Sequence, residues 1–198
     1  MFWDRVSSLY DGFETLINGK VYNHTGEAVA GEISTGDRVL ECACGTGAIS
    51  RYIAPVCREL IATDMSAGMR KQTRKKCRKF SNVKIGYADL THLRFKAETF
   101  DKVVAGNVIH LLDDPKNAVK ELVRVCKKGG KVIIPTYIND DGGKVRTSAK
   151  LLEKIGVEFK REFNIDTYKQ FFSEAGYEDV SYQVVEGHMP CAIAVITK

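Results

Sequence analysis

The sequence lacks the features that mark membrane and secreted proteins. None of its apolar runs approaches the length that spans a bilayer, and the first residues do not form a signal-peptide pattern. Both absences lead us to expect a cytoplasmic protein. The net charge of +5 is mild, so it permits an anionic substrate or partner without requiring one.

A disulfide framework is also lacking. Six cysteines are scattered along 198 residues, and a chain of this length can bury a sizeable core without cross-links. We therefore expect reduced, mostly buried thiols in one domain that covers residues 1–198. A metal held by Cys42 and Cys44 would need a second Cys or His pair at zinc-site spacing, which is absent, so we expect no metal.

The most informative stretch is residues 39–47, which reads Val-Leu-Glu-Cys-Ala-Cys-Gly-Thr-Gly. A short apolar strand runs into a loop that contains Gly45 and Gly47, and apolar residues at helical spacing follow. This order brings backbone N–H groups to a ligand at a helix N-terminus, and glycine lets the ligand approach the backbone. Glu41 lies at the carboxyl end of the strand, the edge where open α/β sheets bind ligands.

Two further carboxylates are predicted at the same edge. Residues 59–64 read as a second buried strand that ends in Asp64, about 20 positions after the loop. A carboxylate there can accept hydrogen bonds from both hydroxyls of a ribose. Asp89 follows a third strand at 82–87 and is a candidate for binding an adenine amino group.

The rest of the pattern predicts a strand followed by a helix five times, then a further helix and a closing hairpin. Helices are predicted in pieces over 1–31, with a break at Asn18, and over 47–54, 67–79, 115–127, 144–162 and 166–175. Strands are predicted at 100–107, 131–137, 180–185 and 192–197. Ser66, Pro115 and Asp166 are expected to begin helices. The result is an α/β fold with a mostly parallel sheet and helices on both faces.

These residues resemble the class I S-adenosyl-L-methionine (SAM)-dependent methyltransferases. The resemblance covers nearly all of residues 35–198, and residues 39–47 are similar to the family's glycine motif, with Ala43 where many members have Gly. The layout is most similar to the small enzymes grouped with quinone-biosynthesis C-methyltransferases. The resemblance implies a Rossmann-like, doubly wound sheet of seven strands in the order 3-2-1-4-5-7-6, with strand 7 antiparallel. The closing hairpin, predicted from the residues, agrees.

The resemblance also implies SAM as the cofactor and S-adenosyl-L-homocysteine as the product. Glu41 and the loop amides would hold the amino-acid tail, Asp64 the ribose, and Asp89 the adenine amine. The expected cofactor-binding residues are Tyr10, Tyr22, Glu41, Ala43, Cys44, Gly45, Thr46, Gly47, Asp64, Met65, Ala88, Asp89, Leu90 and Asn107.

Residues 1–31 precede the first strand and are expected to pack as a helical lid over the ligand edge, on a core formed by residues 35–198. A plain amphipathic helix that covers apolar surface is the alternative, and both can hold at once. Among their aromatic side chains, Tyr10 and Tyr22 are expected to close the site. His110 and Tyr137 follow strands four and five, where a methyl acceptor should lie, and are candidate bases. A packed or solvent-facing loop position is the alternative for His110, and no catalytic residue is assigned.

Two other functions are left open. A nicotinamide-dependent oxidoreductase would use a similar loop and acid, but the run Gly-Thr-Gly-Ala-Ile-Ser lacks the third small Gly or Ala of that motif. A SAM- or RNA-binding protein, catalytic or not, would use the basic helix at 67–79. This helix could bind RNA or membrane phosphates, but it also reads as a solvated face because it lacks interleaved aromatic residues. Without a second domain to grip a macromolecule, we expect a small organic acceptor. The oligomeric state is left open.

Overall fold

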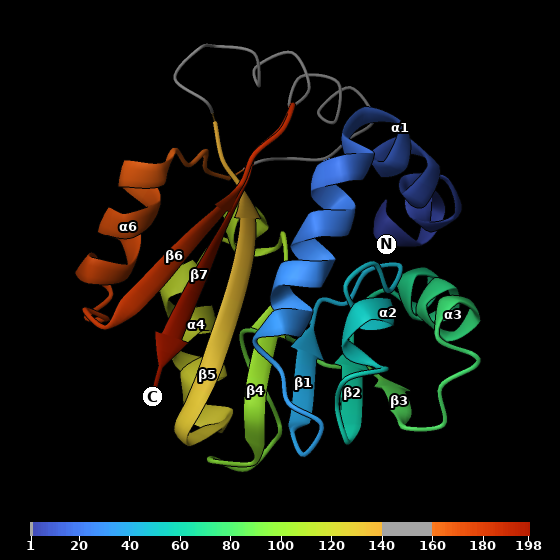
Figure 1. Ribbon diagram of the computed structural model, residues 1–198, viewed down its shortest axis with the longest axis horizontal. Helices are drawn as coiled ribbons and strands as arrows, with labels where there is room; N and C mark the ends of the chain where they lie inside the picture. The colour runs from blue at the N-terminus through green and yellow to red at the C-terminus, as the bar shows by residue number, and fades with distance from the viewer. Residues whose placement is uncertain (1, 140–159) are drawn as a thin grey trace.

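The computed structural model describes residues 2–139 and 160–198; within the first helix, side chains are described at Trp3, Asp4 and Ser7 and from Asn18 onward. A seven-stranded sheet forms its centre (Figure 1). The strands are β1 (Arg38–Cys42), β2 (Glu59–Thr63), β3 (Val83–Gly86), β4 (Phe100–Ala105), β5 (Cys126–Tyr137), β6 (Val180–Val185) and β7 (Cys191–Thr197). Their order is β3-β2-β1-β4-β5-β7-β6, and β7 runs antiparallel to both neighbours. The predicted sheet is confirmed.

Helices cover both faces of the sheet, as predicted (Figure 1). They are α1 (Phe2–Gly31), α2 (Ser50–Ile53), α3 (Ala67–Lys76), η1 (Ile109–Leu111), α4 (Pro115–Val125) and α6 (Ile165–Glu174). Because side chains alternate along a strand, the sheet builds two apolar clusters. Val103 and Val132 pack in the cluster that includes α4 and α6, whereas Val104 and Ile133 pack with α1 and α2. In the described part of the chain, no helix has the length and apolar character to cross a membrane.

The helix starts depend on capping side chains. The Ser66 hydroxyl accepts a hydrogen bond from the Met69 N–H at 3.1 Å, and Pro115 is the first residue of α4, so both predicted starts are confirmed. The prediction that Asp166 caps α6 is wrong. Asn164 is the cap: its side chain accepts from the Thr167 N–H at 2.8 Å, while the Thr167 hydroxyl accepts from the Asn164 N–H at 2.9 Å.

Several predicted boundaries shift, among them the ends of β4 and α4, which come two residues early at Ala105 and Val125. Residues 45–49 form turns, so the helix predicted at 47–54 is only α2, and α3 ends at Lys76 instead of residue 79. β5 begins at Cys126, five residues early, because Gly130 lets the chain run against β4. A Cβ atom on Gly130 would lie 2.6 Å from the carbonyl oxygen of Asp101.

Two predicted helices have a different outcome. The described residues 87–99, between β3 and β4, contain no helix, so the prediction of a helix after every strand is wrong there. Arg124 of α4 instead satisfies carbonyl oxygens of this loop, donating to Leu93 at 2.7 Å and to Phe95 at 2.9 Å. The helix predicted at 144–162 falls almost wholly outside the described residues, and its last three positions, 160–162, are not helical.

A kink at Asn18, the predicted break, divides α1 into two parts. The buried Asn18 amide donates to the Met189 carbonyl at 2.8 Å and accepts from the Met189 N–H at 3.3 Å, which ties the kink to the β6–β7 hairpin. Beyond the kink, α1 lies closely on α2, because a Cβ atom on Gly26 would lie 2.2 Å from the ring of Tyr52. These contacts hold α1 over the sheet.

Replacing Asn18 by Ala should lower the free energy of unfolding by about 1–3 kcal/mol, because two buried backbone groups of Met189 lose their partner. Urea denaturation followed by circular dichroism measures the change. Asn23→Ala is the control: Asn23 is exposed, so water can replace its hydrogen bonds, and a change of about 0.5 kcal/mol or less is expected. Equal losses in the two variants would contradict a stabilising role for the kink contact.

Candidate functional site

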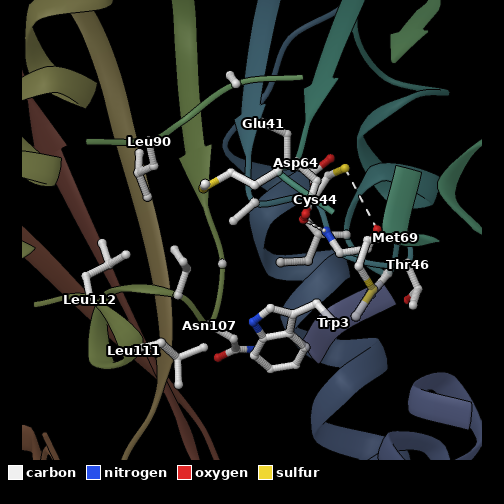
Figure 2. Close-up of a pocket in the computed structure, with 18 of the residues that line it drawn as sticks. Trp3, Glu41, Cys44, Thr46, Asp64, Met69, Leu90, Asn107, Leu111 and Leu112 are labelled. Carbon is white, nitrogen blue, oxygen red and sulfur yellow. Dashed lines mark hydrogen bonds between the residues drawn. The ribbon is translucent and has the colours of Figure 1, made fainter. Parts of the chain in front are cut away.

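A pocket of about 380 Å³ lies at the carboxyl ends of β1–β5 and is lined by side chains from both parts of α1. Figure 2 shows Glu41, Asp64 and Cys44 on one side of it and Leu90, Leu111 and Leu112 on the other. Its walls are formed by Trp3, Tyr22, Thr25, Glu41, Ala43, Cys44, Gly45, Thr46, Ala48, Ile49, Asp64, Met65, Met69, Ala88, Asp89, Leu90, Gly106, Asn107, Val108, Leu111, Leu112 and Tyr137. The edge of the sheet that was predicted to bind a ligand therefore contains a pocket.

All the expected cofactor-binding residues except Tyr10 and Gly47 line this pocket. The Tyr10 side chain lies outside the described residues. Gly47 is placed against α3 instead: its φ is +83°, and a Cβ atom there would lie 3.1 Å from the Cα of Thr73. The geometry brings the other residues together, and their roles in binding stay predictions.

Five apolar residues of the wall were not among the expected binding residues. Ile49 and Met69 come from the turn before α2 and from α3, while Val108, Leu111 and Leu112 come from the segment after β4. The 3₁₀ turn η1 brings the two leucines to the pocket. A short apolar run in a loop has no helical or strand period. The run of apolar residues after β4 was therefore the only signal in the sequence for Val108, Leu111 and Leu112.

The loop after β1 has an unusual backbone. Ala43, Gly45 and Gly47 have φ values of +51°, +55° and +83°, in the left-handed region. Two contacts hold this shape: the Thr73 hydroxyl donates to the Gly45 carbonyl at 2.7 Å, and the Cys44 N–H donates to the Thr63 carbonyl at 2.9 Å. Glycine adopts this conformation without strain, whereas the Cβ of Ala43 makes it costly.

Asp64 is held at the end of β2 by backbone donors. Its Oδ2 accepts from the Gly45 N–H at 2.9 Å, and its Oδ1 accepts from the Ser66 N–H at 2.8 Å. Arg70 fixes the backbone, donating to the carbonyl oxygens of Asp64 at 2.7 Å and Met65 at 2.9 Å. Burial raises the pKa of Asp64, and the two N–H donors oppose that rise. The carboxyl group is therefore fixed before any ligand binds.

Glu41 is the second acid of the pocket and is only 2% exposed. Its carboxyl group accepts a hydrogen bond from the Ser50 hydroxyl at 2.5 Å. Burial raises the pKa of Glu41 to about 8, and the nearby charge of Asp64 acts in the same direction. Glu41 is therefore mostly protonated at pH 7, and a bound cation beside it would favour the ionised form.

Two polar residues complete the edge at β3 and β4. Asp89 is oriented by Thr91, whose N–H and hydroxyl donate to its Oδ1 at 2.8 and 2.7 Å. Asn107 joins the ends of two strands. Its N–H donates to the Pro135 carbonyl at 2.8 Å, and its Oδ1 accepts from the Tyr137 N–H at 3.2 Å. Both side chains are thus positioned at the pocket wall.

The two candidate bases are separated by the structure. Tyr137 lines the pocket, whereas His110 is buried, 5% exposed, and is not among the lining residues. Burial lowers the pKa of His110 to about 4, so its imidazole is neutral and a weak proton acceptor at pH 7. The packed-residue alternative for His110 agrees with this geometry.

All six cysteines are buried thiols, as expected. Burial raises the pKa of Cys42 to about 12, so its sulfur stays protonated. Across residues 2–139 and 160–198, no group of three or more His, Cys, Asp or Glu side chains is arranged to hold a metal ion.

Comparison with known proteins identifies the family. A model of the methyltransferase domain matches residues 40–134. A phosphatidylethanolamine N-methyltransferase from Cereibacter sphaeroides is 31% identical over 173 residues, which cover 85% of this chain and 81% of that protein. The chain belongs to the class I SAM-dependent methyltransferases. The resemblance inferred from the residues is thereby confirmed.

Other relatives agree with this membership. A demethylmenaquinone methyltransferase from Clavibacter sepedonicus is 31% identical over 135 residues, which cover 67% of this chain. The match spans 55% of the length of that relative. Among solved structures, a SAM-dependent methyltransferase from Thermotoga maritima has a TM-score of 0.78 at 22% identity, covering 100% of this chain and 98% of that one, and so shares the fold.

SAM is the cofactor of this methyltransferase family, and the pocket residues fit it. SAM carries a positive charge, a ribose diol and an adenine ring, which require acids and an apolar surface. Glu41, Asp64 and Asp89 supply carboxyl groups in one pocket, while Met65 and Leu90 supply apolar side chains beside Asp64 and Asp89 in the sequence. The donor set therefore agrees with the cofactor.

Replacing Ala43 by Gly should raise the free energy of unfolding by about 1 kcal/mol, because the left-handed backbone no longer carries a Cβ atom. Urea denaturation measures the change. Ala118→Gly is the matched control within α4, and it should lose about 1 kcal/mol or more. A variant at position 43 that is no more stable than the wild type would show that the loop carries no strain there.

Glu41 should make the protein less stable as pH rises. An ordinary glutamate titrates near 4.5 and folded Glu41 near 8, so between these values the folded state holds more protons than the unfolded state. The free energy of unfolding should therefore fall by about 1 kcal/mol per pH unit in this window because of this group. In Glu41→Gln, this fall should disappear. Glu186→Gln, at an exposed position, should keep the wild-type pH dependence, and an unchanged slope in Glu41→Gln would refute the prediction.

Proposed function

We propose that this protein transfers the methyl group of SAM to a small, largely apolar organic acceptor. One observation carries the proposal: two fixed acids, Glu41 and Asp64, face a wall of leucines across a single pocket (Figure 2). The acids suit the charged, hydroxyl-bearing cofactor, and the leucines suit an apolar acceptor. Membership in the methyltransferase family supports the same reaction.

The acidic side of the pocket is proposed to bind the cofactor. Asp64 would accept hydrogen bonds from the ribose, Glu41 and the loop at Thr46 would hold the amino-acid tail, and Asp89 would accept from the adenine amine. Met65 would lie against the adenine. When bound, SAM supplies a methyl group on a positively charged sulfur. The protein's contribution is to align the acceptor with that methyl group and to exclude water, and alignment alone is worth several kcal/mol.

The apolar side is proposed to bind the acceptor. Val108, Leu111 and Leu112 form part of its wall, with Tyr22 of α1 and Tyr137 of β5. The relatives are named for demethylmenaquinone and phosphatidylethanolamine, which are both lipids. We therefore propose a lipid-like acceptor whose apolar part occupies this side, with the Tyr137 hydroxyl positioning its polar end.

Residues 1–31 are proposed to act as a lid on the core at 35–198, within one domain in the cytoplasm. Asp4 attaches the start of α1 to the start of α3: its Oδ1 accepts from the Ser66 hydroxyl at 2.6 Å and from the Gly68 N–H at 2.9 Å. These two hydrogen bonds lower the pKa of Asp4 to about 2, so it stays charged near neutral pH. The attachment holds Trp3 in the pocket wall.

The single tryptophan of the chain gives a direct test of cofactor binding. Because Trp3 lines the pocket, SAM and S-adenosyl-L-homocysteine should change its fluorescence in a saturable manner, whereas NAD should not. Calorimetry gives the dissociation constant. Asp64→Asn should weaken SAM binding by roughly 10- to 100-fold, the value of a charge-assisted hydrogen bond.

Asp113→Asn removes the same charge from an exposed position outside the pocket and should leave SAM affinity unchanged. Transfer of labelled methyl groups to a quinol, a phospholipid or a bulk tRNA then tests the acceptor. No SAM binding by the folded protein would overturn the proposed function, and methylation confined to tRNA would overturn the lipid-like acceptor.

A further inference from the structure

The segment between Asp64 and Asp89 has an extreme charge distribution. It contains no Asp or Glu, but it holds eight basic residues, more than the net charge of +5 of the whole chain. They are Arg70, Lys71, Arg74, Lys75, Lys76, Arg78, Lys79 and Lys84. Repulsion among eight positive charges is unfavourable unless solvent or an anionic partner screens it. The position of these side chains on the surface therefore shows where such a partner would bind.

α3 turns three of these eight basic residues to its exposed side. Met69 and Thr73 are its buried residues, so the opposite side of the helix carries the exposed Lys71, Arg74 and Lys75. Exposed Arg78 follows one turn after Arg74 and extends the same stripe beyond the helix end.

Two exposed apolar side chains continue this stripe toward the pocket. Among the described residues, Met65 and Tyr87 are the exposed large apolar ones, with 43% and 64% of their surface accessible. Arg70 joins them: its guanidinium lies 5.7 Å from the centre of the Tyr87 ring and donates to the Met65 carbonyl at 2.9 Å. Arg74 donates to the Ile85 carbonyl at 3.4 Å, two residues before Tyr87. We name the set Met65, Arg70, Lys71, Arg74, Lys75, Arg78 and Tyr87 the cationic patch.

The cationic patch reaches the pocket itself. Met65 is both a member of the patch and part of the pocket wall, so a surface bound at the patch would meet the pocket at this residue. In Figure 1, α3 lies beside the first part of α1 and above β3, on the side of the molecule where the pocket-forming loops gather. Charge, exposed apolar groups and access to the pocket therefore coincide.

We propose that the cationic patch docks the protein on an anionic lipid bilayer, with Tyr87 entering the headgroup layer and Met65 at the boundary between that layer and the pocket. Anionic headgroups attract clustered Lys and Arg side chains, and tyrosine favours the interface because it has an apolar ring and a polar hydroxyl. The inference rests on the proposed function in one respect: a lipid-like acceptor would be held in the bilayer. Nucleic acid is less suited, because the patch offers a single aromatic ring and an apolar methionine beside a largely apolar pocket.

Sedimentation with vesicles tests the proposal. The full chain should bind vesicles of phosphatidylcholine with phosphatidylglycerol and not vesicles of phosphatidylcholine alone, and added salt should weaken the binding. The variant K71Q/K75Q/R78Q should bind at least tenfold more weakly, since each basic residue near an anionic surface contributes roughly fivefold. Y87S should weaken binding several-fold without any change of charge.

The variant K96Q/K120Q/K128Q is the matched control. It removes the same charge at exposed lysines near the start of β4, on α4 and in β5, and it should bind vesicles nearly as well as the wild type. Equal loss in both triple variants, or binding that ignores phosphatidylglycerol, would overturn the proposal. So would binding of an RNA homopolymer through Lys71, Lys75 and Arg78 without vesicle binding.

Calorimetry with SAM on the same samples separates the two proposals. K71Q/K75Q/R78Q keeps every residue assigned to the cofactor, so its SAM affinity should equal that of the wild type. If the wild type binds vesicles through the cationic patch but does not bind SAM, the docking surface stands and the proposed function fails. If the wild type binds SAM but does not bind vesicles, the proposed function stands and the docking surface fails.

Discussion

The hydrogen bond from the Gly45 N–H to the Asp64 carboxylate is the contact on which the site depends. It joins the loop after β1 to the end of β2, and it forms only because the loop carries left-handed residues at 43, 45 and 47. Gly47 lies against α3, where Thr73 in turn holds the Gly45 carbonyl. One bend of the backbone thus positions a strand end, a helix and a carboxylate together.

The electrostatics of the pocket follow from that same bend. Glu41 and Asp64 are brought into one poorly solvated space, where two negative charges are costly. The protein resolves this by keeping Glu41 protonated near neutral pH, with the Ser50 hydroxyl as its partner. A cationic ligand would relieve the cost, so the charge of the proposed cofactor and the protonation of Glu41 are thermodynamically linked.

α1 adds the remaining wall through contacts far apart in the sequence. Asn18 bonds to Met189, 171 residues later, while Asp4 bonds to the start of α3, 62 and 64 residues later. The two parts of α1 are therefore attached to different regions: the second to the sheet and α2, the first to α3. The first part bears Trp3 and the Asp4 contact, so it is the part that a lid movement would release.

The sequence by itself determined the strands and their ligand edge, because Glu41, Asp64 and Asp89 lie at or just after strands that can be read from local apolar runs. The short connection before β7 requires an antiparallel strand. The order of the seven strands came from the family resemblance. Only the tertiary structure decided the rest. The apolar wall at Leu111 and Leu112 and the burial of His110 depend on contacts that leave no period in the sequence. In a strand, every second side chain faces the core, so the alternation of apolar residues is visible in the sequence. A side chain in a loop has no such period, because its neighbours are set only when distant segments pack around it.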